Sequence, residues 1–147
     1  MRKLFSLRRV YAHCDIPCGI YDPHTAEIAA LTVLRMLELI GESKDAHDIS
    51  RYTAVKEEHA ERCKREIMII WGDFFKTEDL NIEINALVHR IMELASRAKQ
   101  ERERKHGEDL LEAVNQFAEL FWSKQGVKIK RVAAPHKVEA QIVIPEL

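Results

Sequence analysis

The segment INALVHRIMELASRA, residues 84–98, has the clearest helical pattern in the chain. Its apolar residues recur at steps of three and four, so they line one side of an α-helix. These residues are Ile84, Leu87, Val88, Ile91, Leu94, Ala95 and Ala98. An apolar stripe of this kind must be buried against other elements, so the segment predicts a helix that packs within a larger assembly of helices.

Three further segments repeat this spacing. The first spans residues 22–41, because Asp22 supplies an N-cap and Pro23 fits the first helical position. The second spans residues 50–74 and the last spans residues 108–125. Four amphipathic helices with short connections bury their stripes most simply side by side. The sequence therefore predicts an all-α fold, an antiparallel up-down-up-down four-helix bundle.

The connections and the tail carry weaker patterns. Gly107 is expected to break the chain before the last helix. The tail, residues 127–147, alternates apolar and polar residues at 127–130 and again at 141–144. We expect an irregular C-terminal extension of unknown role, with short strands as the alternative.

Composition excludes several classes of protein. The chain has 147 residues, 46% hydrophobic and 32% charged, with a formal net charge of −1, which fits one globular domain with one core. No apolar run approaches the roughly 20 residues that cross a bilayer. No concentrated Lys/Arg face indicates a nucleic-acid partner. Neither a membrane nor a nucleic acid is therefore expected as a partner.

The first twelve residues, MRKLFSLRRVYA, carry four basic residues and no acidic one. A secretory signal needs an apolar stretch of about 7–15 residues, and here Ser6 and the pair Arg8-Arg9 interrupt it. We therefore expect a cytoplasmic protein. Residues 1–12 are either a leader that is cleaved after Ala12 or a frayed basic N-terminus.

The next segment, residues 13–21, reads HCDIPCGIY and gathers an imidazole and two thiols outside the helices. Its Cys-x3-Cys pair can chelate one metal ion if the loop folds into a hook, which Pro17 and Gly19 favour. Spacing alone leaves several interpretations open. They are a zinc site, a disulfide between Cys14 and Cys18, a square-planar site for nickel(II) or copper(II), and no site at all.

The longer segment HCDIPCGIYDP, residues 13–23, resembles the nickel hook of the nickel-containing superoxide dismutase family. The resemblance extends to residues 54–76 and to Phe121-Trp122, and covers residues 13–125. It implies an oxidoreductase that converts superoxide to dioxygen and hydrogen peroxide, with one nickel ion per chain alternating between Ni²⁺ and Ni³⁺. It also implies that a processing peptidase removes the propeptide, residues 1–12, and that the chains form a homo-oligomer, a hexamer.

The same resemblance assigns the nickel ligands. They are the free amine and imidazole of His13, the thiolates of Cys14 and Cys18, and the backbone amide of Cys14. The His13 amine exists only after cleavage, so the precursor is expected to lack the complete site. Anionic amide and thiolate donors stabilise the higher oxidation state of the metal. Tyr21 matches the family tyrosine that screens the open face of the metal, with a packing role as the alternative.

Other positions depart from the family pattern. Ala29 and His59 stand where the family has a glutamate and an arginine that hold the axial imidazole, and Phe74 replaces a second hook-facing tyrosine. His59 is therefore a candidate partner for His13, with a hydrogen-bonded core histidine as the alternative. Ala29 and Phe74 favour the alternative function, a non-catalytic metal-binding or interaction bundle that kept the hook but lost the residues that support its ligands.

The remaining residues complete the expected organisation. We expect a leader at 1–12, a hook-and-bundle domain at 13–126 and an extension at 127–147. Lys76 either draws the anionic substrate or is simply solvated. The side chains expected in the core are Cys63, Trp71 and Trp122.

Overall fold

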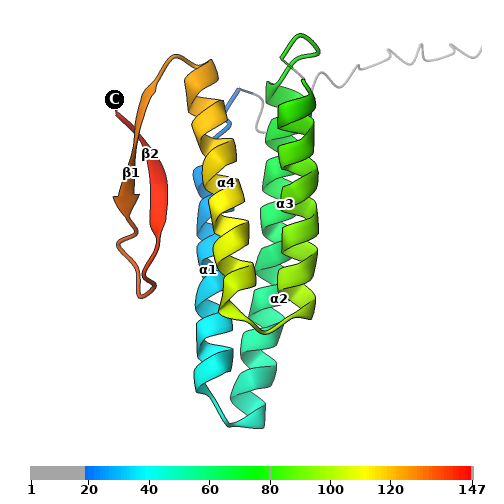
Figure 1. Cartoon of the computed structure of the whole chain (residues 1–147), viewed down its shortest axis with the longest axis vertical. Helices are drawn as coiled ribbons and strands as arrows, with labels where there is room; N and C mark the ends of the chain where they lie inside the picture. The colour runs from blue at the N-terminus through cyan, green and yellow to red at the C-terminus, as the bar shows by residue number, and fades with distance from the viewer. Residues whose placement is uncertain (1–18, 80, 147) are drawn as a thin grey trace, which may run out of the picture.

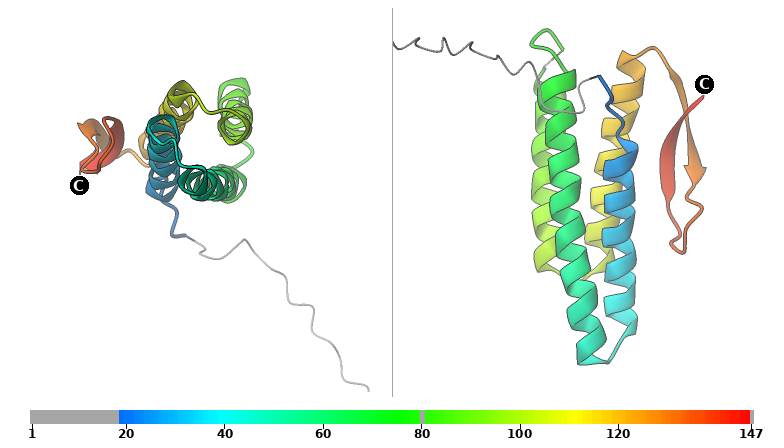
Figure 2. Two further views of the ribbon diagram at one scale, coloured as in Figure 1. Left: turned by 90° about the horizontal axis from the view of Figure 1, so that it is seen from below. Right: turned by 180° about the vertical axis from the view of Figure 1, so that it is seen from behind.

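The computed structural model describes residues 19–79 and 81–146 (Figure 1). Its elements are α1 (His24–Glu42), α2 (Ala46–Ile69), the π-helix η1 (Ile70–Phe74), α3 (Ile82–Gln100), α4 (Arg104–Lys124), β1 (Lys128–Ala133) and β2 (Gln141–Glu146). The four long helices run alternately up and down and pack side by side (Figure 2). The predicted up-down-up-down bundle is confirmed. No helix in the described part of the chain is long and apolar enough to cross a membrane.

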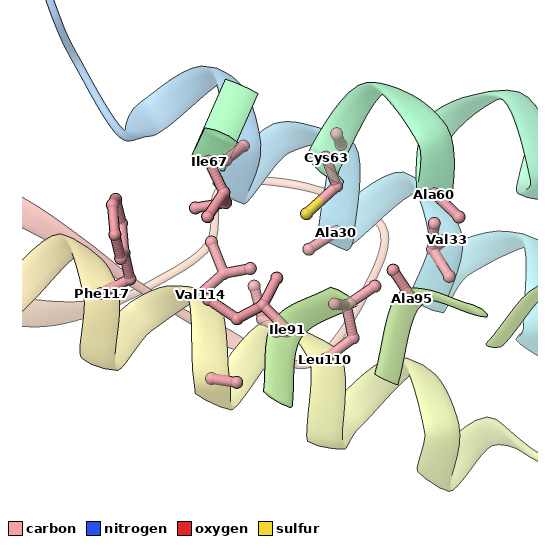
Figure 3. Close-up of a cluster of buried hydrophobic side chains, with 14 of the residues drawn as sticks. Ala30, Val33, Ala60, Cys63, Ile67, Ile91, Ala95, Leu110, Val114 and Phe117 are labelled. Atoms are coloured by element: carbon pink, nitrogen blue, oxygen red, sulfur yellow. The ribbon is translucent and has the colours of Figure 1, made fainter. Parts of the chain in front are cut away.

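The core contains side chains from all four helices, and Figure 3 shows Ala30, Cys63, Ile91 and Val114 meeting along the bundle. Cys63 is fully buried, as predicted, and burial raises the pKa of its thiol to about 12, so this thiol is unreactive. Fully burying an aliphatic side chain contributes about 1.5–3 kcal/mol, which makes these stripes the main source of stability. The two tryptophans, Trp71 and Trp122, pack against this core while remaining partly exposed.

The glycine expected to interrupt the chain lies inside a helix. Gly107 is buried within α4, which begins at Arg104. A Cβ atom at this position would lie only 2.8 Å from the Cα of Leu34 and 3.0 Å from the Cδ1 of Leu37. The predicted break is therefore wrong. A glycine in a helix costs only about 1 kcal/mol, and here it allows α4 to approach α1 closely.

The C-terminal extension is also more ordered than expected. Strands β1 and β2 pair in antiparallel fashion, with Arg131 opposite Val143. This hairpin packs beside α4 and α1, on the side of the bundle away from α2 and α3 (Figure 2). Ile142 and Val143 are buried, so the hairpin extends the core. The expected irregular extension is thus wrong, and the alternative of short strands is correct.

Candidate metal centre

The predicted ligands His13, Cys14 and Cys18 lie outside the described residues. The segment that follows them, residues 19–23, is described and leads into α1. It lies at the end of the bundle that also holds η1 and the last turn of α4 (Figure 1). We call this end, formed by residues 19–23, 70–79 and 121–126, the hook end.

The turn before α1 is fixed by local bonds. Gly19 has a φ of +81°, in the left-handed region that favours glycine. The Oδ1 of Asp22 accepts a hydrogen bond of 2.8 Å from the backbone N–H of His24. Pro23 is buried, and its carbonyl accepts the first backbone bonds of α1. The predicted start at Asp22-Pro23 is therefore confirmed to within two residues.

An aromatic cluster lies beneath this turn. Tyr21 is half-buried, and its ring centroid lies 6.1 Å from that of Phe74 in an edge-on arrangement. Phe74 lies 4.5 Å from Phe121, which in turn lies 4.9 Å from Trp122. Phe74 belongs to η1, and π-helical turns are frequent at functional sites. The cluster thus anchors Tyr21 at the base of the hook, whereas Phe74 supplies a ring without a hydroxyl.

Two lysines lie beside the aromatic cluster. The Nζ of Lys124 is 6.0 Å from the centroid of the Phe74 ring and forms an ion pair with Asp79. The other oxygen of Asp79 accepts a bond of 2.8 Å from the backbone N–H of Lys76. The hydrogen bond from Lys124 lowers the pKa of Asp79, which therefore stays ionised at neutral pH. Residue spacing does not indicate a role for Lys124, because a basic residue in the last turn of a helix is already explained by the helix dipole.

His59 lies on α2 beside the inward stripe and not within it. The buried residues of this stripe are Lys56, Ala60, Cys63 and Ile67, whereas His59 is half-buried. Its Nδ1 atom is buried and has no hydrogen-bond partner in the described part of the chain. An unsatisfied buried polar atom costs about 1–3 kcal/mol. The alternative role, a hydrogen-bonded core histidine, therefore has no supporting bond among the described residues. Ala29 is buried and offers no polar group.

The donor set in the sequence fits nickel. Two thiols and an imidazole at residues 13–18 supply the sulfur and nitrogen donors that suit a tetragonal nickel site. Among the described residues, one group has metal-ligand spacing: Glu101, Glu103 and His106, whose ligand atoms lie within 4.8 Å of one another. These side chains are exposed or half-exposed, offer no sulfur, and lie at the opposite end of the bundle. The hook is therefore the candidate nickel site.

Comparison with known proteins agrees with this fold and donor set. The family model of nickel-containing superoxide dismutase matches residues 8–125. The enzyme "Superoxide dismutase [Ni]" of Streptomyces coelicolor is 35% identical over 115 residues, covering 77% of this chain and 88% of the relative. Its counterpart in Streptomyces seoulensis is 34% identical over 125 residues, covering 83% and 95%.

Solved structures give the same result. The native structure of a nickel superoxide dismutase superposes with a TM-score of 0.73 at 33% identity, covering 78% of this chain and 99% of that chain. A structure of such an enzyme with the nickel ligation of the oxidised state gives the same TM-score, identity and coverage. The family model spans most of the residues, including the hook and all four helices, and so the chain belongs to the nickel-containing superoxide dismutase family.

Proposed function

We propose that the chain is a nickel superoxide dismutase: two superoxide ions and two protons give one dioxygen and one hydrogen peroxide. The observation that carries this proposal is the continuous match of the family model across the hook and the bundle. The same match disfavours the rival function, a non-catalytic bundle that kept the hook. A nickel ion bound by the hook would supply the one-electron redox chemistry of this reaction.

The hook residues provide the ligands in this proposal. His13 binds through its amine and imidazole, and Cys14 and Cys18 bind as thiolates, with the backbone amide of Cys14 as the remaining donor. All of these groups bind in deprotonated form, so nickel affinity falls as the pH falls. A peptidase that cleaves after Ala12 releases the amine of His13.

The described residues of the hook end bind and orient the substrate. Tyr21, held against Phe74, screens the open face of the site and positions small anions there. Since Phe74 has no hydroxyl, Tyr21 and solvent supply the two protons that the reaction consumes. Removal of residues 1–12 takes four of the 23 basic residues, leaving 19 against 24 acidic residues and a net charge of −5. Superoxide is then repelled overall, and Lys124 and Lys76 supply the local attraction.

Assembly and location complete the proposal. Ile20, Met68 and Ile82 expose 76%, 54% and 91% of their surface near the hook end. Contiguous exposed apolar patches are typical of surfaces that pack against a partner, and we take these three side chains at one end of the bundle as support for such a surface. They support a homo-oligomer, a hexamer as in the family resemblance, in which neighbouring subunits cover the hooks. The basic leader without an apolar stretch supports a cytoplasmic location.

The test is superoxide decay in stopped-flow measurements. A chain that begins at His13 is loaded with nickel and compared with the same chain loaded with zinc and with a nickel-treated chain that keeps residues 1–12. Rapid decay in the first sample alone supports the proposal. A nickel-loaded chain that begins at His13 and does not accelerate decay would support the rival function.

A further inference from the structure

The C-terminal hairpin presents one edge of β2 to the bundle. The backbone N–H of Val143 donates a hydrogen bond of 2.7 Å to the Oε1 of Glu27 on α1. The carbonyl of Gln141 accepts one of 2.9 Å from the Nδ2 of Asn115 on α4. Residues two apart along a strand share a side, so both bonds satisfy the same edge. Two helices thus provide the partners that a third strand would provide.

These contacts use side chains that are otherwise costly to bury. Within the described residues, the buried polar or charged side chains are Glu27, Lys56 and Asn115, and two of these three bind the hairpin. Burial raises the pKa of Glu27, while the Val143 N–H and the nearby His24 act in the opposite direction. Burying a polar group is tolerated when it is hydrogen-bonded. The bundle is therefore built to hold the hairpin, although the family model ends at residue 125, before β1.

From Glu27 a chain of contacts leads to the base of the hook. The Oε2 of Glu27 lies 3.4 Å from the Nδ1 of His24, whose backbone N–H bonds to Asp22. Asp22 follows Tyr21, the residue anchored against Phe74. The hairpin lies along the half of the bundle in which α1 begins (Figure 1). A bond from β2 therefore acts on the first turn of α1, directly after the hook.

We propose that the C-terminal hairpin braces the hook, and that Glu27 is the positioning residue through which it acts. The bond from Val143 to Glu27 holds the first turn of α1 and thereby limits the motion of residues 19–23. The hook then keeps its nickel longer than it would on a free helix end. This last consequence rests on the proposed nickel site, whereas the mechanical claim does not.

The test compares three variants of the full chain. Glu27→Met keeps the length of the side chain and removes the acceptor, whereas Glu27→Gln keeps an acceptor oxygen. Lys56→Met is the matched control, because Lys56 is also buried but binds the carbonyls of Lys99 and Glu101 at the other end of the bundle. The measurements are hydrogen–deuterium exchange of residues 19–27 and 128–146, and the rate of nickel loss to a chelator.

We expect Glu27→Met to raise exchange in both segments and to speed nickel loss by about tenfold, as removal of a supporting partner typically does. Glu27→Gln should give the exchange and the rate of nickel loss of the parent chain. Lys56→Met should lower the melting temperature and leave the exchange of both segments and the rate of nickel loss unchanged. Faster exchange in 128–146 alone, with 19–27 and nickel loss unaffected, would overturn the proposal.

Val143→Pro provides a second route if Glu27→Met does not fold. It removes the N–H donor on β2 and leaves every helix intact, and the same exchange pattern is expected. A chain that binds nickel without dismuting superoxide would contradict the proposed function, while the exchange results would still decide the role of the hairpin.

Discussion

The two ends of the bundle are built on different principles. The distal end, formed by residues 42–46 and 100–104, is closed by polar bonds: the buried Lys56 binds the last carbonyls of α3, and Asp45 caps α2 by accepting from the N–H of Asp48. The hook end also has polar bonds, such as the pair of Lys124 with Asp79, but adds aromatic rings, a π-helical turn and exposed apolar side chains. The distal end is thus closed by polar bonds, whereas the hook end also presents the aromatic and apolar side chains on which the proposed site depends.

The largest expected effect tests this difference between the two ends of the bundle directly. Replacing Cys14 or Cys18 by Ser removes a proposed nickel ligand from the segment that precedes the described residues. We expect turnover to be lost, while the helical circular dichroism and the melting temperature stay as in the parent chain. Loss of helical signal in either variant would mean that these cysteines support the fold.

Gly107→Ala tests the close packing of α4 against α1 within the bundle. The added methyl group would meet the backbone of Leu34 at 2.8 Å, so α1 and α4 must separate. Overpacking of this kind costs about 1–3 kcal/mol, and the free energy of unfolding in urea should fall by that amount with turnover per nickel unchanged. Gly41→Ala is the control, because nothing lies within 4 Å of its added Cβ and the variant should gain stability. Equal stability of the two variants would contradict the close packing of these helices.

His59→Gln tests whether α2 contributes to the site beyond packing. Its buried Nδ1 has no partner in the described part of the chain. We propose that it supports His13 directly or through water. Turnover should fall by about tenfold at equal nickel loading, with the fold retained. Unchanged turnover would make His59 a packing residue.

The smallest effect concerns charge. Lys124→Gln removes a cation beside Phe74, and we expect kcat/KM to fall by about twofold at low ionic strength, with a weaker dependence on salt than in the parent chain. Lys105→Gln, an equal change of charge on the first turns of α4 near the distal end, should leave kcat/KM unaltered. Identical behaviour of the two variants would show that only net charge matters.

The periodic parts of the chain could be predicted and the tertiary contacts could not. The helix through Ile91, the start at Pro23 and the buried Cys63 all follow from local spacing and capping. Local spacing predicts the wrong role for Gly107, because its close approach to Leu34, far away in sequence, decides that role. Similarly, Glu27 can be buried because it accepts a bond from Val143, on a strand more than a hundred residues away in sequence.

In the candidate site, too, local patterns could be predicted and tertiary contacts could not. A short motif defines the proposed ligands, since His13, Cys14 and Cys18 lie within six residues of one another. The pairing of Lys124 with Asp79 depends instead on how the ends of the helices meet, and no spacing indicates it. Local motifs therefore predict the chemistry, whereas the surroundings that tune it require the fold.

We propose above that a processed hook, and not the bundle, holds the metal. Intact mass and elemental analysis of the protein purified from its own host test this claim most directly. We predict a chain that begins at His13 and contains about one nickel ion, because the His13 amine becomes a ligand only after cleavage. A chain that still begins at Met1 and carries zinc would contradict the account.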